Sequence, residues 1–306
     1  MDYAHKQTDK HLKELERRIS TTFEKSLREI RKESKPFFDW LKKEEKRKKK
    51  QLKDGQITRD EYNRWRLLTT LNSDRYKRLE EKLCRIMLQS NKVAAAYING
   101  DMNYIFRLNA NYAAYDLFTL ASDYEFDLWD EDTVKRLLVE QPDLLPEAKV
   151  NAKIDLTWNR KQISKAITSS ILQGKTVPQI ANDLIERLKT VNKSSAINKA
   201  RTAATSAQNA GRQARYDRAE QMGLKIEKEW IATLDGRTRK SHRKLDGERV
   251  PKDGKFSNGL RYPGDNRGKP EEVWGCRCTM VAKIKGIKYT KKRMTYEEWE
   301  ASKNGS

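Results

Sequence analysis

The sequence predicts an α+β protein in which an elongated, mostly helical region precedes a small antiparallel sheet near the C-terminal end. Helices are predicted because apolar residues recur at spacings of three and four through most of the chain, and 36% of all residues are charged. The sheet is predicted by two short segments of alternating apolar residues, at 224–234 and 276–284. Between them lies a stretch rich in Gly, Pro, Asn and Asp, for which we expect an irregular but ordered surface loop.

The length of 306 residues allows two domains, and a loop marked by Pro142 and Pro146 suggests where the first one ends. The second domain is expected to hold helices first and the sheet afterwards. The predicted regions are a basic helical domain at 1–150, a second domain at 151–284 with helices over 151–223 and the sheet over 224–284, and a basic tail at 285–306.

The first helix is predicted over residues 5–33, and Pro36 is expected to interrupt it because proline lacks the backbone donor that a helix requires. Its apolar stripe consists of Leu12, Leu15, Ile19, Phe23, Leu27 and Ile30.

Further along the chain, Thr58 opens a helix to about Ser90 through a capping box with Glu61. A break is predicted at Asn99-Gly100-Asp101, and a stripe of small residues from Ala200 to Ala214 predicts a tightly packed helix.

The densest positive charge lies in residues 41–50, where seven of ten residues are Lys or Arg. Such a run is most often a solvated helix face or a linker, and a phosphate-binding patch is the alternative. No aromatic residue is interleaved to stack on bases, so binding there would not depend on nucleotide sequence. The candidate DNA-binding residues in this run are Lys46, Arg47, Lys48, Lys49 and Lys50.

The formal net charge of +21 points to a polyanionic partner, most simply nucleic acid, and a solubility surface is the alternative. No apolar run approaches the length of a membrane span, so no membrane partner is expected. Three cysteines are too few for a disulfide framework, which favours a reducing cytosol.

The most informative stretch runs from Trp230 to Thr279 and contains His242, Cys276 and Cys278. It reads W-x-A-T-x-D-x-R-T-R-x-S-H, followed by L-D-G, F-x-x-G, Y-P-G-D and C-R-C-T. This ordered pattern resembles the phage Mu F-like head morphogenesis family, whose members are minor head proteins of tailed bacteriophages. The resemblance covers roughly residues 175–284. It implies association with the portal or the procapsid interior and with packaged DNA.

Three interpretations of His242, Cys276 and Cys278 remain open. In the first, they hold a structural zinc ion that is completed by Asp235, Asp246 or Asp265. One geometric difficulty is that side chains two apart on a strand are about 6.6–6.8 Å from each other, too far for two sulfurs on one zinc unless the strand kinks.

In the second interpretation, His242 is a general base for nuclease or phosphotransfer chemistry, and Arg237 and Arg239 stabilise phosphate charge. The same arginines are also candidate DNA-binding residues. In the third, His242 belongs to a buried polar network with the arginines, and the cysteines are small core residues. Trp230, Asp235, Asp246 and Asp265 are then structural residues of the motif, with no cofactor and no catalytic residue.

The resemblance therefore implies a minor head or capsid protein of a tailed phage, located in the virion and, during assembly, in the host cytoplasm. Its predicted partners are the portal, capsid or scaffolding proteins and double-stranded DNA bound without sequence specificity. An enzyme is not expected. The alternative is a nuclease or toxin-like effector that is packaged in the head and delivered with the genome.

Overall fold

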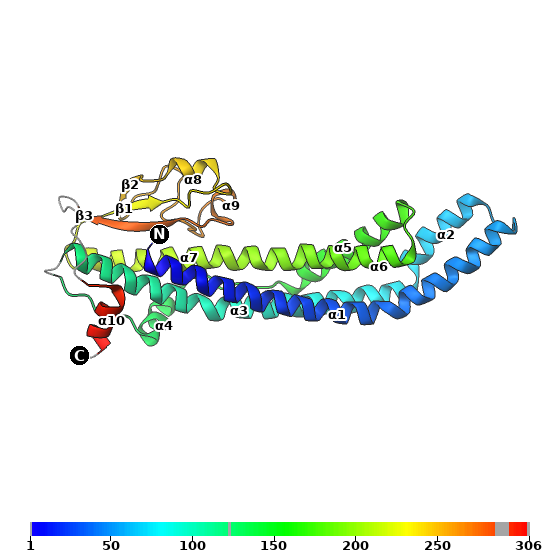
Figure 1. The fold of residues 1–306 in the computed structure, drawn as a ribbon, viewed down its shortest axis with the longest axis horizontal. Coiled ribbons are helices and arrows are strands. Elements are labelled where there is room, and N and C mark those ends of the chain that lie inside the picture. The colour runs from blue at the N-terminus through cyan, green and yellow to red at the C-terminus, as the bar shows by residue number, and fades with distance from the viewer. Residues whose placement is uncertain (1, 122–123, 285–293, 305–306) are drawn as a thin grey trace. The chain divides into compact units, whose positions relative to one another are not determined.

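The computed structural model describes residues 2–121, 124–284 and 294–304, which form helices and one three-stranded antiparallel sheet near the C-terminal end (Figure 1). The predicted, mostly helical α+β class is confirmed. The longer elements are α1 (Tyr3–Lys53), α2 (Arg59–Asn72), α3 (Asp74–Leu120), α4 (Glu131–Glu140), α5 (Ala152–Leu172), α6 (Val177–Leu188), α7 (Ser194–Gln221), β1 (Ile226–Ile231), β3 (Thr279–Ile284) and α10 (Tyr296–Asn304). The shorter ones are the helical turns η1 (Pro142–Leu144), η2 (Lys189–Lys193), α8 (Lys240–Lys244) and α9 (Pro270–Val273), and the strand β2 (Arg249–Pro251).

The chain folds into two compact units, and each is discontinuous in sequence because boundaries fall inside α1, α3 and α7 as well as between residues 148 and 149. The sheet-bearing unit comprises Met1–Glu16, Ala96–Ala148 and Asn198–Ser306. The all-helical unit comprises Arg17–Ala95 and Lys149–Ile197. These units describe packing in space, and the division of the sequence at residue 150 stays a prediction.

In the all-helical unit, α1 continues through Pro36, where the sequence predicted an interruption. A proline inside a helix removes one backbone hydrogen bond and costs about 3 kcal/mol. The apolar stripe resumes directly after it, with Phe37, Phe38 and Leu41 all buried. Burying a large apolar side chain contributes about 1.5–3 kcal/mol, so these three residues outweigh the cost of the proline.

The capping box at the start of α2 is confirmed, since Glu61 N donates to Thr58 Oγ1 and Thr58 N donates to the Glu61 carboxylate. The helix predicted from here to Ser90 is instead divided at Ser73, whose backbone is extended. The break predicted at Asn99-Gly100-Asp101 is absent, and α3 runs through it.

The side chains at that predicted break have partners outside their own helix. The Asn99 side chain accepts from Ala148 N (2.7 Å) and donates to Ala148 O (3.1 Å), and Asp101 lies 3.2 Å from His11. Side chains that bind elsewhere do not compete for the helix backbone, which is the usual reason why Asn and Asp break helices.

In the sheet-bearing unit, β1 is the central strand, with β2 and β3 antiparallel on either side (Figure 1). Trp230 pairs with Met280, and Glu229 pairs with Arg249. The strands are shorter than the predicted 224–234 and 276–284, and both cysteines precede β3. Within the predicted basic tail, residues 296–304 form the helix α10, whereas the basic residues 288–293 lie outside the described residues.

Helix α7 lies against the sheet and against the C-terminal part of α3, and its small residues make this possible. Ala200, Ala204, Ala207 and Ala214 are buried, which confirms the predicted packing stripe. Gly211 is the closest point, because a Cβ built there would lie 2.3 Å from Phe106 O and 3.2 Å from Ala110 N of α3. Such a distance leaves no room for any side chain.

None of the helices in the described part of the chain combines the length and the apolar character that crossing a bilayer would demand.

We predict that Gly211→Ala destabilises the protein by about 1–3 kcal/mol, because the added methyl group forces α7 away from the α3 backbone. Gly100→Ala is the matched control, since Gly100 is also helical and a Cβ there meets nothing within 4 Å. It should stabilise by about 0.5–1 kcal/mol. Urea unfolding measures both. Equal effects of the two variants would contradict the close approach of α7 and α3.

Candidate functional site

The site is formed where the short helix α8 meets the segment between α9 and β3. His242 lies on α8, and Cys276 and Cys278 lie just before β3. His242 Nδ1 is 3.6 Å from Cys276 Sγ and 3.5 Å from Cys278 Sγ. All three side chains are buried, and their three donor atoms lie within 4.8 Å of one another. The structure thus brings together the three residues that the sequence selected.

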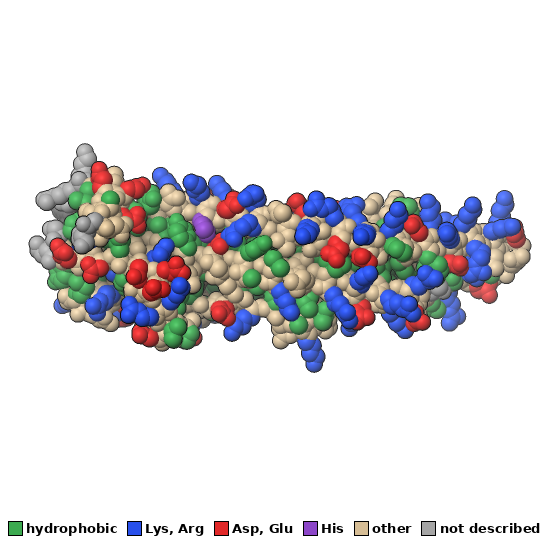
Figure 2. Space-filling view, turned by 90° about the horizontal axis from the view of Figure 1, so that it is seen from below, with side chains coloured by type: hydrophobic (Ala, Val, Ile, Leu, Met, Phe, Trp, Pro, Cys, Tyr) green, Lys and Arg blue, Asp and Glu red, His purple; other side chains and the backbone are tan. Residues whose placement is uncertain are grey.

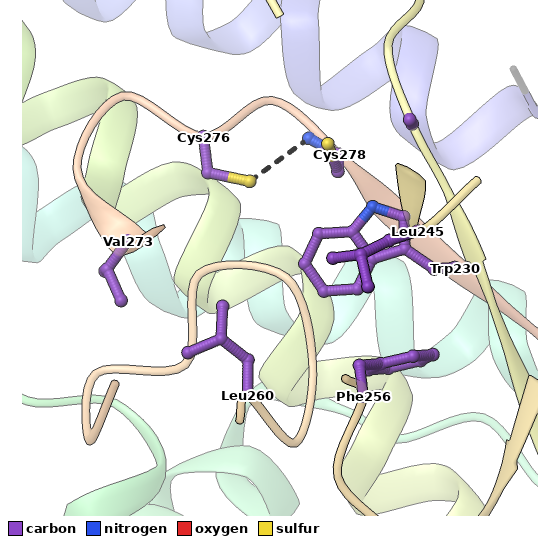
Figure 3. Packing of buried hydrophobic residues seen from close by; sticks show 8 residues of the cluster. Trp230, Leu245, Phe256, Leu260, Val273, Cys276 and Cys278 are labelled. Carbon is purple, nitrogen blue, oxygen red and sulfur yellow. Dashed lines mark hydrogen bonds between the residues drawn. The ribbon is translucent and has the colours of Figure 1, made fainter. Parts of the chain in front are cut away.

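An apolar cluster surrounds these three residues. Figure 3 shows Cys276 and Cys278 side by side, with Trp230, Leu245, Phe256 and Leu260 packed beneath them. The Trp230 ring meets the His242 ring edge-on at 5.1 Å and the Phe256 ring at 5.0 Å. Because most of the surrounding side chains are apolar, the two sulfurs and the His242 ring have few polar neighbours.

The cysteine segment is an irregular turn, and the strand predicted to begin at Cys276 begins at Thr279. Gly275 has a φ of +66°, and Cys278 N donates to Cys276 Sγ at 3.4 Å, drawn as the dashed line in Figure 3. This bend brings the two sulfurs onto the same side of the chain. The geometric difficulty that a straight strand would pose for a shared metal ion is therefore absent.

Helix α7 holds this turn through its buried polar side chains. Thr205 Oγ1 donates to Cys276 O at 2.6 Å, and Asn209 Nδ2 donates to Cys278 O at 3.1 Å. Asn209 Oδ1 also accepts from Met280 N at 3.2 Å. The backbone on both sides of each thiol is thus fixed by one helix, and these two helix residues were not selected from the sequence.

Glu272 is the site residue that sequence reasoning missed. Its Oε2 lies 2.9 Å from His242 Nε2, on the ring edge remote from the two sulfurs, and it also accepts from Ser241 Oγ at 3.1 Å. The signal available in the sequence was weak, because Glu272 lies 30 positions from His242 within a loop-rich stretch.

The three aspartates proposed to complete a metal site lie in other contacts. Asp235 forms a two-pronged ion pair with Arg277 at 2.6 Å on each arm, which lowers the pKa of its carboxyl group. Asp246 accepts from Ala232 N at 2.8 Å. Asp265 binds Arg261 through both carboxylate oxygens at 2.9 Å. Each carboxylate stabilises a turn, as a structural role of the motif would require.

The two thiols differ in their tendency to lose a proton. The hydrogen bond with Cys276 lowers the pKa of Cys278, and the contact with His242 adds to that effect against the opposing effect of burial. The hydrogen bond with Cys278, together with burial, raises the pKa of Cys276. One thiol of the pair therefore ionises more readily than a free cysteine, and the second resists ionisation.

The guanidinium groups of the two motif arginines, Arg237 and Arg239, differ in whether they are already bound within the protein. Arg239 donates to the backbone carbonyls of Glu271 and Trp274, so its guanidinium fastens α9 to the segment before α8. Arg237 is exposed, and its backbone N–H donates to Asp235 Oδ1 at 2.9 Å. A role of either in DNA binding stays a prediction.

The predicted basic run lies on the last turns of α1, in the all-helical unit. Lys46, Arg47, Lys49 and Lys50 are exposed, and Lys48 is half-buried. Arg47 pairs with Glu44 at 2.7 Å and Lys49 with Glu45 at 3.6 Å. Lys46, Lys48 and Lys50 have no ion-pair partner among the described residues.

Comparison with known proteins identifies the region that carries this site. Residues 161–281 match the family described as Phage Mu protein F like protein. The resemblance to the phage Mu F-like family that the motif indicated is confirmed over this region. The match includes α7, β1, β2, the first residues of β3 and all four residues His242, Glu272, Cys276 and Cys278.

Two curated proteins are similar to this chain. One is the minor head protein GP7 of Bacillus phage SPP1, 28% identical over 215 residues, which are 63% of this chain and 66% of that protein. The other is NAD(+)–arginine ADP-ribosyltransferase EFV of Enterococcus faecalis, 31% identical over 160 residues, which are 47% of this chain. The chain spans one third of that enzyme's length and just under two thirds of the head protein's. No solved structure matches the chain.

We predict that Asn209→Leu destabilises the protein by roughly 2–6 kcal/mol, because it leaves Cys278 O and Met280 N buried without their partner, at about 1–3 kcal/mol each. Asn198→Leu on the exposed face of the same helix is the matched control and should change stability by less than about 0.5 kcal/mol. Chemical denaturation of both variants gives the comparison. Similar stabilities would show that Asn209 does not support the cysteine turn.

Proposed function

We propose that this protein acts in assembly of the phage head, where it associates with the portal or other capsid components and contacts DNA through phosphate groups. The observation that carries this proposal is the similarity to a phage minor head protein over 63% of the chain, together with the match of residues 161–281 to the Mu F-like family. A location in the virion follows from this role.

The charge on the end of α1 supports the DNA part of the proposal. Figure 2 shows Lys and Arg side chains crowded where Figure 1 places the turn between α1 and α2. Three lysines of the run, Lys46, Lys48 and Lys50, form no ion pair with a described carboxylate, and Lys48 interacts with Glu61 only at longer range. Lysine binds phosphate as a point charge and releases condensed counterions, which gives affinity without base readout.

A toxin-like effector delivered with the genome is the second candidate function. The observation in its favour is the similarity to an ADP-ribosyltransferase, although the aligned region is one third of that enzyme. Catalysis by His242 has little support from the geometry. Its ring is buried, with the thiols against Nδ1 and Glu272 against Nε2, whereas a general base must reach a substrate proton.

We predict that the purified chain binds duplex DNA of any sequence and that a Lys46→Gln, Lys48→Gln, Lys50→Gln variant binds it more weakly. Removing one lysine–phosphate interaction makes the negative slope of log affinity against log salt shallower by about 0.9. The triple variant should therefore make this slope shallower by roughly 3. Mobility shifts across a salt series measure the slope.

The matched control for this experiment is Lys153→Gln, Lys161→Gln, Lys165→Gln on α5, which removes the same charge from exposed positions of the same unit. It should leave the slope closer to that of the unaltered chain. If both variants behave alike, the DNA contact is not at the end of α1. Cleavage of the DNA that disappears in His242→Ala would instead favour the nuclease alternative.

We also predict that the chain co-purifies with the portal protein of its own phage when the two are expressed together, as a portal-associated head protein should. Sedimentation with portal oligomers is the measurement. The triple lysine variant should sediment with the portal as the unaltered chain does, because assembly contacts and phosphate contacts are separate. A chain that stays free of both portal and procapsid would contradict the assembly role.

A further inference from the structure

We propose that His242, Cys276 and Cys278 bind one Zn²⁺ ion, which clips helix α8 to the turn that precedes β3. This structural metal site is independent of the proposed role in head assembly. The ligands would be the two cysteine sulfurs and His242 Nδ1.

The distances between the ligand atoms fit this ion. Zinc lies about 2.3 Å from a thiolate sulfur and about 2.0–2.1 Å from an imidazole nitrogen, and a tetrahedral angle then separates sulfur from nitrogen by about 3.5 Å. The two observed separations from His242 Nδ1 are 3.6 Å to Cys276 Sγ and 3.5 Å to Cys278 Sγ. The three donor atoms all lie within 4.8 Å of one another, so an ion needs only a small closure of the sulfurs.

The histidine is oriented as a metal ligand should be. Glu272 Oε2 lies 2.9 Å from Nε2 and favours a proton on that nitrogen, which leaves the Nδ1 lone pair directed at the sulfurs. Carboxylates behind zinc-binding histidines fix the ring and its tautomer in this way. Glu272 is itself held by Ser241 Oγ at 3.1 Å and Asn258 Nδ2 at 3.3 Å, so it acts as a positioning residue.

The cysteine side is equally well fixed before any ion arrives. The carbonyl groups of Cys276 and Cys278 are bound by Thr205 and Asn209 of α7, and the turn at Gly275 brings both sulfurs toward the histidine. A site whose ligands are already placed loses little conformational freedom on binding.

The position of the site indicates that the ion would stabilise the fold. His242 and Cys276 are 34 residues apart, and the chain between them is mostly irregular apart from β2 and α9. A cross-link across a loop of that length removes freedom from the unfolded chain and so stabilises the fold. Each thiol that binds the ion gives its proton to the solvent, so no oxidant is needed.

The experiment is metal analysis of the full chain, purified without chelators, followed by removal of bound metal and titration with Co²⁺ as a spectroscopic substitute for zinc. We expect one zinc per chain, one equivalent of Co²⁺ taken up with sulfur-to-cobalt charge-transfer absorption, and a higher melting temperature when metal is bound.

Variants assign the ligands. Cys276→Ser and Cys278→Ser should each abolish the charge-transfer band or reduce metal affinity more than 100-fold. Cys84→Ser is the matched control, because Cys84 is also a buried free thiol but lies on α3 in the all-helical unit. It should retain full binding. Glu272→Gln should keep the stoichiometry and weaken affinity roughly 10–100-fold, as expected of a residue behind the ligand.

The cobalt titration of the unaltered chain tests the metal site even if a ligand variant fails to fold. A folded chain that contains no zinc and takes up no Co²⁺ with a thiolate spectrum would overturn the proposal, and the three residues would then be a hydrogen-bonded part of the apolar cluster. Equal loss of binding in Cys84→Ser and Cys276→Ser would also overturn the assignment of the site.

Discussion

The contact on which the C-terminal module depends is the one between α7 and the backbone of residues 276–280. Three side chains of α7 bind carbonyl groups along this segment, namely Thr205 at Cys276, Asn209 at Cys278 and Arg212 at Met280. A strand that enters a sheet from an irregular loop leaves backbone groups without ladder partners, and each one is costly when buried. The helix supplies the missing partners, and in doing so it places both thiols against His242.

The same helix is fixed on its other side by close packing. Gly211 allows α7 to touch the α3 backbone at Phe106, and the buried Arg212 guanidinium reaches Asp2 at 2.9 Å and Asn109 at 3.2 Å. A buried charge is tolerated when it is paired and hydrogen-bonded, and the raised pKa of Arg212, which results from Asp2 against the opposing effect of burial, is consistent with this pairing. Strand, helix and N-terminal residues are therefore linked through adjacent residues of a single helix.

Charged side chains have different roles in the two units. In the sheet-bearing unit, several carboxylates of the motif are paired with arginines, as in Asp235 with Arg277 and Asp265 with Arg261, whereas Arg237 is exposed. In the all-helical unit, Lys46 and Lys50 near the end of α1 are exposed and lie in no ion pair with a described residue. Paired charges fix loops through directional bonds, whereas solvated charges attract polyanions through their summed field. This contrast is why the proposed DNA contact is assigned to α1.

The sequence by itself determined the fold class, most helices and the identity of the three clustered residues, because periodicity and rare residue types are local signals. Thr58, the small residues of α7 and the trio of His242, Cys276 and Cys278 were all readable in this way. Only the tertiary structure decided that α1 passes through Pro36, that β3 begins after Cys278, and that Glu272 stands behind His242. Each of these features depends on residues distant in sequence. Burial of apolar side chains outweighs the cost of Pro36 in α1, and side chains of α7 bind the backbone of the cysteine turn. A loop brings the carboxylate of Glu272 to His242.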